Sequence, residues 1–243
     1  MFFTETIRRY LVKRSTLDSI NKAHEDLNGL IYKVLDLKSA HLQDLWVLSN
    51  FGSKKGFFVE FGAYDGAASS NTITLETDFD WTGIIAEPAI GMREQIRKNR
   101  RCQMDFRAVW DKSSEFIEFT EDLVEGYLSV AVQDKMINSG NKNHSYKVET
   151  VTLLDLLNQH NAPKIIDYVS IDVEGSELRI LDHFFSNNKY YEINLWSVEH
   201  NFREQSSDLL KMFQENGYRN VHRELSHRDF WFIKNDFNSS SES

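Results

Sequence analysis

The stretch FFVEFGAYDG, Phe57–Gly66, decides the fold. Its first half is a short apolar run that predicts a buried strand, and its second half predicts a glycine turn that opens a helix over 70–79. A strand, a glycine turn and a helix in this order are typical of the ligand-binding edge of a doubly wound sheet. The stretch therefore predicts an α/β fold with a binding site at the turn.

The chain on either side repeats this alternation. Apolar runs predict strands at 57–61, 83–87, 102–110, 165–172 and 192–199, and amphipathic segments predict helices at 70–79, 89–100, 151–160, 175–187 and 203–216. Strands that alternate with helices give right-handed crossovers and a mostly parallel sheet. Residues 217–234 leave no room for a crossover helix and predict an antiparallel hairpin at the edge of the sheet. Residues 1–50 predict a helical start.

Composition narrows the class of protein. The 243 residues suit one α/β domain, and their net charge is −9. The single cysteine, Cys102, excludes an intrachain disulfide and a thiolate zinc cluster. The negative charge also argues against nucleic acid or an anionic membrane as the partner. No apolar run is long enough for a transmembrane segment, and the first residues lack the features of a signal peptide. We expect a cytoplasmic protein.

The turn itself does not suit a dinucleotide. Tyr64 stands where the dinucleotide fingerprint needs its middle glycine, and Glu60 and Asp65 would repel a pyrophosphate. S-adenosylmethionine, which carries an ammonium group, a carboxylate and a sulfonium, fits better. Glu60 or Asp65 would hold the ammonium, and the amide groups near 69–71 would hold the carboxylate.

The next two strands supply candidates for the rest of this cofactor. Glu87 ends the second strand directly before Pro88, where a carboxylate accepts hydrogen bonds from a ribose diol. Ala108, Val109 and Trp110 end the third strand and are candidates to flank the adenine.

The fourth and fifth strands end in groups suited to proton transfer. Asp172 follows a buried strand, and Glu199, His200 and Asn201 follow the next. Methyl transfer to a hydroxyl needs either a base or a divalent metal that acidifies the hydroxyl. The candidate catalytic residues are Asp172, Glu199 and His200. The alternative interpretations are that Asp172 is an acid at a helix N-terminus and that His200 is a half-buried histidine with its hydrogen bonds satisfied, which for His200 is as good an interpretation as a base. Asp172, Glu199 and Asn201 are the candidate oxygen ligands for Mg²⁺.

These motifs together resemble a known family. GFFVEFGAYDG, SNTITLE, WTGIIAEP, FRAVWD, VTLLDLL, IDYVSIDVEGSELRIL and WSVEHN follow one another as in the FkbM-type S-adenosylmethionine-dependent methyltransferases. The resemblance covers about residues 43–234. It implies a class I methyltransferase (Rossmann-like) fold: a seven-stranded, mostly parallel sheet with an antiparallel edge hairpin, preceded here by an N-terminal helical extension, 1–42, and followed by a polar tail, 235–243. Many members carry a lysine where this chain has Ser170, so no role of that lysine carries over.

The resemblance implies O-methylation of a sugar, a glycan or a natural product. It places Asp172 and Glu174 at the reaction face. With the residue chemistry above, the candidate cofactor-binding residues are Glu60, Phe61, Gly62, Ala63, Asp65, Gly66, Ser70, Asn71, Glu87, Pro88, Ala108, Val109, Asp172 and Glu174.

Two other classes of function stay open. One is a nicotinamide-dependent oxidoreductase on the same architecture, and the other is a non-catalytic interaction protein that keeps the fold. The expected partner is a small-molecule or glycan acceptor, and the N-terminal helices are candidates for a homo-oligomer contact.

Overall fold

The structure is a computed structural model that describes residues 38–52, 54–68, 70–121, 144–200 and 206–238. The predicted helices before residue 38 and the last five residues of the tail lie outside these ranges. The same holds for Asn201.

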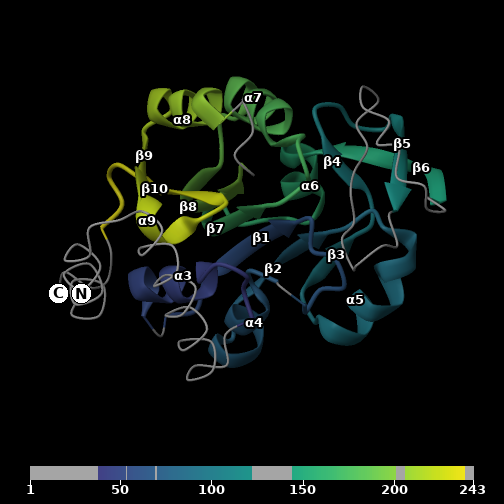
Figure 1. Cartoon of the computed structure of the whole chain (residues 1–243), viewed down its shortest axis with the longest axis horizontal. Helices are drawn as coiled ribbons and strands as arrows, with labels where there is room; N and C mark the ends of the chain where they lie inside the picture. The colour runs from purple at the N-terminus through teal and green to yellow at the C-terminus, as the bar shows by residue number, and fades with distance from the viewer. Residues whose placement is uncertain (1–37, 53, 69, 122–143, 201–205, 239–243) are drawn as a thin grey trace, which may run out of the picture.

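A seven-stranded sheet forms the centre of the molecule (Figure 1). Its strand order is β3-β2-β1-β7-β8-β10-β9, in which β10 pairs antiparallel with β8 and β9 pairs antiparallel with β10. The other pairs are parallel. The predicted α/β fold with an antiparallel edge hairpin is therefore confirmed. The strands are β1 (Phe57–Phe61), β2 (Thr82–Ala86), β3 (Gln103–Asp105), β7 (Ile165–Ile171), β8 (Glu192–Glu199), β9 (Tyr218–Val221) and β10 (Asp229–Lys234).

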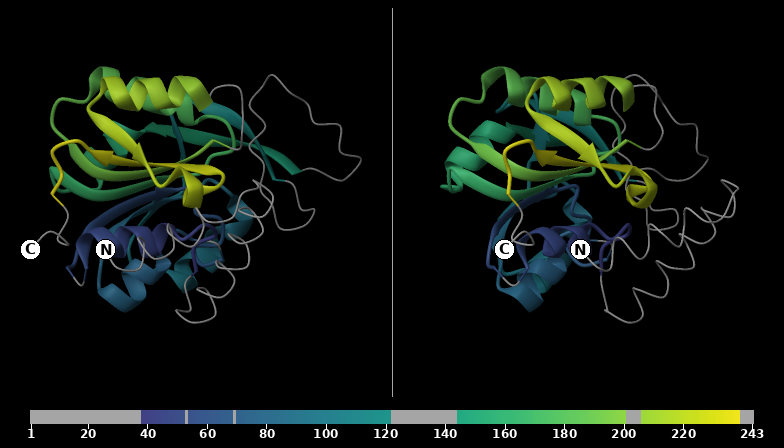
Figure 2. Two further views of the ribbon diagram at one scale, coloured as in Figure 1. Left: turned by 60° about the vertical axis from the view of Figure 1, so that its left-hand side comes forward. Right: turned by 90° about the vertical axis from the view of Figure 1, so that its left-hand side faces the viewer.

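Helices cover both faces of this sheet (Figure 2). One face carries α6 (Leu153–Gln159), α7 (Glu177–Asn187) and α8 (Ser206–Glu215), and the other carries α3 (Gln43–Phe51), α4 (Ile73–Phe79), the short η1 (Ile90–Met92) and α5 (Arg93–Asn99). A short helix, α9 (Arg223–Ser226), lies between β9 and β10. Helix α6 begins where the sequence supplies a cap, because the Thr152 side chain accepts a hydrogen bond from the Asp155 amide at 3.1 Å.

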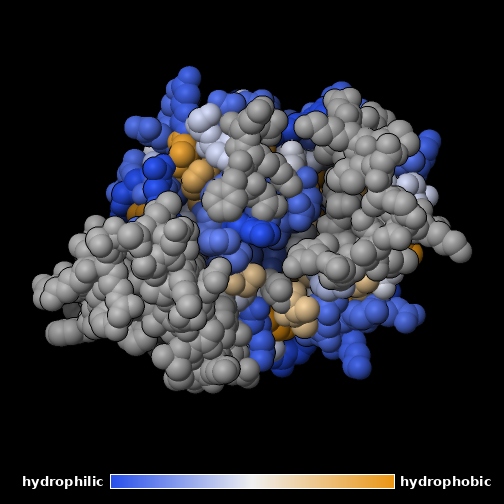
Figure 3. Space-filling view, viewed as in Figure 1, coloured by the Kyte–Doolittle hydropathy of each residue, from blue (hydrophilic) through white to orange (hydrophobic). Residues whose placement is uncertain are grey.

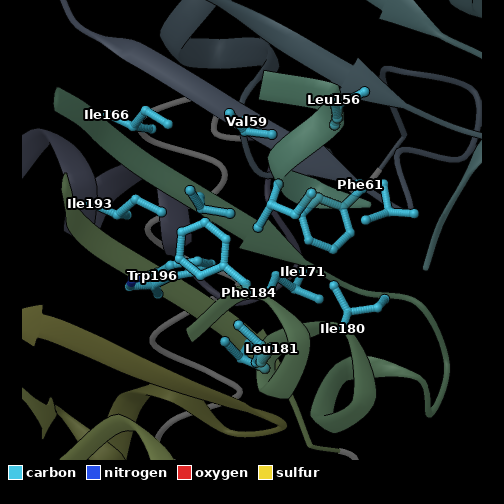
Figure 4. Packing of buried hydrophobic residues seen from close by; sticks show 14 of the residues in the cluster. Val59, Phe61, Leu156, Ile166, Ile171, Ile180, Leu181, Phe184, Ile193 and Trp196 are labelled. Atoms are coloured by element: carbon cyan, nitrogen blue, oxygen red, sulfur yellow. The ribbon is translucent and has the colours of Figure 1, made fainter. Parts of the chain in front are cut away.

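The two helical layers enclose two apolar cores because side chains alternate along each strand. In β1, Val59 and Phe61 pack toward α6 and α7, whereas Phe58 packs toward α3 and α4. Figure 4 shows the first core, in which Phe184 and Leu181 of α7 lie against the strands. Burial on both faces explains why these strands read as almost continuous apolar runs in the sequence.

One prediction for the middle of the chain needs correction. The predicted single strand over 102–110 is two strands, because Arg107 folds back on Asp105 through hydrogen bonds from its backbone amide, at 3.0 Å, and its guanidinium. The second piece, β4 (Ala108–Trp110), leaves the main sheet. It joins β5 (Phe116–Glu121) and β6 (His144–Thr152), two unpredicted strands, in a small sheet of order β4-β6-β5.

One face of the molecule is mainly polar over its described area. The face in Figure 3 is hydrophilic over most of its described area, with small hydrophobic areas between. None of the helices in the described part of the chain has both the length and the apolar character that crossing a bilayer requires.

Candidate active site

The carboxyl ends of the parallel strands meet at a cavity of about 590 Å³. It lies where β1 and β7 are neighbours and the chain proceeds outward in opposite directions, the switch point at which doubly wound sheets bind ligands. Its walls include many of the predicted residues: Phe61, Gly62, Ala63, Ser70, Asn71, Glu87, Pro88, Ala108, Val109, Asp172, Glu174 and Glu199. The structure thus brings residues from six separate segments to one place.

Gly62 lets β1 and β7 come together at the floor of the cavity. Its φ is +84°, and a Cβ atom at this position would lie 1.6 Å from the carbonyl oxygen of Asp172. The Asp172 amide in turn donates a hydrogen bond to the Phe61 carbonyl at 3.1 Å. A side chain at residue 62 would therefore displace the backbone that carries Asp172.

Glu87 joins the turns that follow the first two strands. It is 4% exposed, and its two carboxylate oxygens accept backbone hydrogen bonds from Tyr64 and Ala89, each at 2.9 Å. These two bonds fix the orientation of the carboxylate at the cavity that Glu87 lines.

Glu60, in contrast, does not line the cavity. Its carboxylate accepts hydrogen bonds from the Ser70 hydroxyl and the Asn71 amide, and it pairs with Arg100 at 3.2 Å. The Arg100 guanidinium is fully buried and also pairs with Glu76 at 2.5 Å. Glu60 thus stabilises the loop that leads into α4, and the Asn71 amide predicted to hold a carboxylate is already used.

Asp65 and Gly66 are also absent from the lining. One Asp65 carboxylate oxygen accepts the amides of Ala67 and Ala68 at 2.8 and 2.7 Å, which closes the turn locally. Gly66 packs on Arg100, where a Cβ atom would lie 2.9 Å from the Arg100 Cγ. The predicted assignment of the cofactor's ammonium to Glu60 or Asp65 therefore lacks support from the geometry, because neither carboxylate faces the cavity.

The predicted adenine residues reach the cavity from another sheet. Ala108, Val109 and Trp110 form β4, which pairs with β6 rather than with the main sheet, and all three line the cavity. Ile117 and Phe119 of β5 add apolar surface beside them. The small sheet is therefore a wall of the site, which the interpretation of 102–110 as one strand missed.

Asp172, which is partly buried, and Glu199, which is buried, form a carboxyl pair at the other side of the cavity. A hydrogen bond joins them, and Glu199 is 7% exposed. Burial is the main cause that raises the pKa of both groups above the ordinary carboxyl range, and the pKa of Glu199 is raised further by the neighbouring charge of Asp172. The pair therefore retains a proton at a pH where isolated carboxyls are ionised.

A further acid, Asp229, was not predicted. It begins β10 and lies opposite Glu199 in the antiparallel register. Burial and the charge of Asp172 raise the pKa of Asp229 to about 8, and the Gln43 side-chain amide donates a hydrogen bond to it at 2.6 Å. An antiparallel strand begins where its parallel neighbour ends, so the hairpin prediction contained the signal that residue 229 would reach this edge.

The remaining wall comes from both ends of the described chain. Ala40, His41 and Gln43 lie at the start of the N-terminal part, and His227 and Arg228 precede β10; all five line the cavity. The His41 and His227 rings lie 5.0 Å apart. This wall was not predicted, because no local sequence pattern indicates that residues 40–43 meet residues 227–229.

His200 is not part of the lining. Its ring stacks on Phe230 with centroids 4.1 Å apart, and its amide donates to the Arg228 carbonyl at 2.8 Å. Burial lowers the pKa of His200, and the nearby His227 and Arg223 add to this effect. The structure thus gives His200 the packing role of a buried histidine.

Sequence comparison identifies the class of protein that has this fold and site. The family model described as "Methyltransferase FkbM domain" matches residues 60–220, well over half of the chain. The chain belongs to the FkbM methyltransferase family, as its motifs predicted. No curated protein matches it.

Several solved structures are similar in fold. Precorrin-6y C5,15-methyltransferase from Geobacter metallireducens GS-15 is 10% identical with a TM-score of 0.43, over 81% of this chain and 88% of that one. A human methyltransferase 10 domain containing protein is 12% identical with a TM-score of 0.45, over 90% and 97%. Methyltransferase FkbM from Methylobacillus flagellatus KT is 10% identical with a TM-score of 0.43, over 74% of this chain but only 43% of its own.

Proposed function

We propose that the protein is an S-adenosylmethionine-dependent O-methyltransferase whose acceptor is a hydroxyl group of a sugar, a glycan or a natural product. The observation that carries the proposal is the placement of Glu87 and the Asp172–Glu199 pair on one cavity beside the Gly62 turn. In this proposal Glu87 binds the methyl donor, and the Asp172–Glu199 pair accepts the proton of the acceptor hydroxyl in the same cavity.

Glu87 supports the donor half of the proposal. Tyr64 and Ala89 fix its carboxylate, so its orientation is set before a ligand arrives. A carboxylate held at the end of a strand suits the two hydroxyls of a ribose. Pro88, Ala108 and Val109 lie on the cavity beside it and offer apolar surface to an adenine ring.

The charges at the site favour this cofactor over a dinucleotide. Tyr64 lines the cavity where a pyrophosphate would need an open glycine backbone. Asp172, Glu174 and Glu199 would repel a diphosphate, whereas a cofactor with an ammonium and a sulfonium group offsets their charge. With Glu60 and Asp65 turned away, Glu174 becomes the proposed partner of the ammonium.

The carboxyl pair supports the acceptor half. When the methyl group moves from the sulfonium to the acceptor oxygen, the sulfonium becomes a neutral thioether and the hydroxyl must release its proton. Because Glu199 has the more strongly raised pKa, it keeps the proton that the pair shares, and Asp172 is the carboxylate that accepts the new one. An amine acceptor would not need a base of this kind to the same extent.

The acceptor wall supports a polyhydroxyl compound. His41, Gln43, His227 and Arg228 present polar groups on the side of the cavity next to Asp229. Such groups suit the hydroxyls of a sugar, and the volume of about 590 Å³ is within the usual range for a small-molecule site.

A transfer assay tests the proposal. The protein is incubated with S-adenosylmethionine that carries a tritium-labelled methyl group and with a panel of saccharides and amines. We expect the label on saccharide hydroxyls. We expect Asp172→Asn to bind S-adenosylhomocysteine almost normally and to lose transfer by at least about a hundredfold, as removal of a general base does. Asp182→Asn, an exposed acid on α7, is the matched control and is expected to act as wild type.

Transfer to amines alone would refute the choice of a hydroxyl. A protein that binds the cofactor and transfers to nothing would favour the non-catalytic alternative. Membership of a methyltransferase family weighs against the oxidoreductase alternative, and titration with NADH, which is expected to show no binding, checks it.

A further inference from the structure

One side chain joins the two segments of the acceptor wall. Gln43 accepts a hydrogen bond from the His41 amide at 2.8 Å and donates one to the Asp229 carboxylate at 2.6 Å. Both Gln43 and Asp229 are buried. The rings of His41 and His227 lie 5.0 Å apart where these two segments meet. The wall therefore has a defined shape before a ligand binds.

The cavity has an uneven distribution of charge. Arg228 is the one arginine or lysine among the described residues that line it. Five carboxylic acids also line it, namely Glu87, Asp172, Glu174, Glu199 and Asp229. The first four lie at the carboxyl ends of the parallel strands β2, β7 and β8, whereas Arg228 precedes the antiparallel strand β10. Positive charge from an arginine is thus present on the acceptor wall only.

The Arg228 guanidinium has no partner in the described part of the chain. No carboxylate there forms an ion pair with it, and its side chain donates no hydrogen bond to another described residue. The adjacent carboxylate of Asp229 binds Gln43 instead. The Arg228 backbone, however, is fixed, because its carbonyl accepts the His200 amide at 2.8 Å. An exposed, unpaired guanidinium is therefore anchored at the cavity.

A guanidinium at such a place matches one kind of ligand group. Its N–H donors form a planar fork that binds both oxygens of a carboxylate or two oxygens of a phosphate. The neighbouring imidazole rings of His41 and His227 each carry an N–H donor in either protonation state. All three residues line the cavity, so an anion beside Arg228 meets donors from both segments of the wall.

We propose that Arg228, flanked by His41 and His227, is a subsite for an anionic group of the acceptor, and that the acceptor is an acidic sugar with a carboxylate or a phosphate. This inference deepens the proposed function and rests on it for the reaction at the hydroxyl. The anionic group lies at Arg228 while the hydroxyl lies at Asp172. The reverse orientation would bring the anion to Asp172 and Glu174, which repel it. Opposite charges on the two sides of the cavity thus set the orientation of the acceptor.

Binding of three sugars in the absence of a methyl donor tests the subsite. Methyl glucoside, methyl glucuronide and the phosphate ester of methyl glucoside differ in one exocyclic group, which is neutral, a carboxylate or a phosphate. Each is titrated into the full chain at neutral pH, and binding is followed by nuclear magnetic resonance. We expect at least one anionic sugar to bind at least tenfold more tightly than the neutral one, as hydrogen bonds to charged groups do. The tighter of the two identifies the anionic group.

Two arginine variants locate the preference. Arg228→Gln is expected to remove it, and the variant should fold because the side chain is exposed and the carbonyl that binds His200 remains. Arg223→Gln is the matched control. Arg223 is an exposed arginine of α9 that does not line the cavity, so this variant is expected to keep the wild-type preference.

The proposal is overturned if neither anionic sugar binds more tightly than the neutral one. It is also overturned if Arg228→Gln keeps the preference or if Arg223→Gln loses it to the same extent. The titration contains no methyl donor, so its result is separate from the transfer assay. Preference for an anionic sugar without methyl transfer would leave the subsite intact while the proposed function fails. Methyl transfer to saccharides without any such preference would leave the proposed function intact while the subsite fails.

Discussion

Replacing Gly62 with alanine tests the packing that forms the floor of the site. A Cβ atom would lie 1.6 Å from the Asp172 carbonyl oxygen and 2.6 Å from its carbon, both backbone atoms that cannot rotate away. The φ of +84° adds a cost of about 1–2 kcal/mol for any residue with a Cβ atom. Overpacking adds roughly 1–3 kcal/mol, so we expect a total loss of about 2–5 kcal/mol in the free energy of unfolding.

Gly217→Ala separates these two costs. Gly217 has the same φ of +84°, but a Cβ atom there meets nothing within 4 Å. Urea denaturation followed by circular dichroism should therefore show a loss of about 1–2 kcal/mol for Gly217→Ala and a clearly larger loss for Gly62→Ala. Only Gly62→Ala should also lose S-adenosylhomocysteine binding. Equal losses of stability in the two variants would refute the close contact between β1 and β7.

Two further changes test the buried charges. Burial and the charge of Asp172 raise the pKa of Asp229 to about 8 in the folded protein. Because this pKa lies above the value in the unfolded chain, the protonated form of Asp229 stabilises the fold. That stabilisation is lost as the pH rises between about 4 and 8. Denaturation of metal-free protein at several pH values measures this effect. In this window the free energy of unfolding of the wild type should fall by up to about 1.4 kcal/mol per pH unit more than that of Asp229→Asn. Parallel pH profiles of the two proteins would contradict the raised pKa. Arg100→Met should lower the free energy of unfolding by about 3–5 kcal/mol, because it leaves Glu60 and Glu76 buried without the cation they pair with. A loss below about 1 kcal/mol in denaturation would show that these ion pairs do not stabilise the fold.

The alternation of strands and helices could be predicted because each element carries its own pattern. The apolar run of 165–171 and the amphipathic repeat of 175–187 are local signals, and the structure has β7 at Ile165–Ile171 and α7 at Glu177–Asn187. Gly62 and Glu87 could be predicted as site residues because they follow the carboxyl ends of β1 and β2, which parallel pairing brings to one edge of the sheet. Cavity residues at the ends of β1, β2, β7 and β8 follow from that geometry alone.

What the sequence could not supply was the choice of partner for each acid. Glu60 and Glu87 both lie beside the first turn, yet Arg100, which follows α5 and lies 40 residues from Glu60, engages Glu60 and leaves Glu87 on the cavity. The small sheet was missed for a similar reason, because its strands pair across the chain between β4 and β6. Long-range contacts of this kind leave no periodic pattern in the sequence.

Isothermal titration with S-adenosylhomocysteine tests the central claim, that the cavity binds an amino-acid nucleoside through Glu87. We expect one molecule to bind per wild-type chain and Glu87→Gln to bind at least tenfold more weakly, because a hydrogen bond to a charged group contributes about 1.5–3 kcal/mol. The control Asp182→Asn should bind as wild type. No binding to the wild type, or equal binding by Glu87→Gln, would contradict the account.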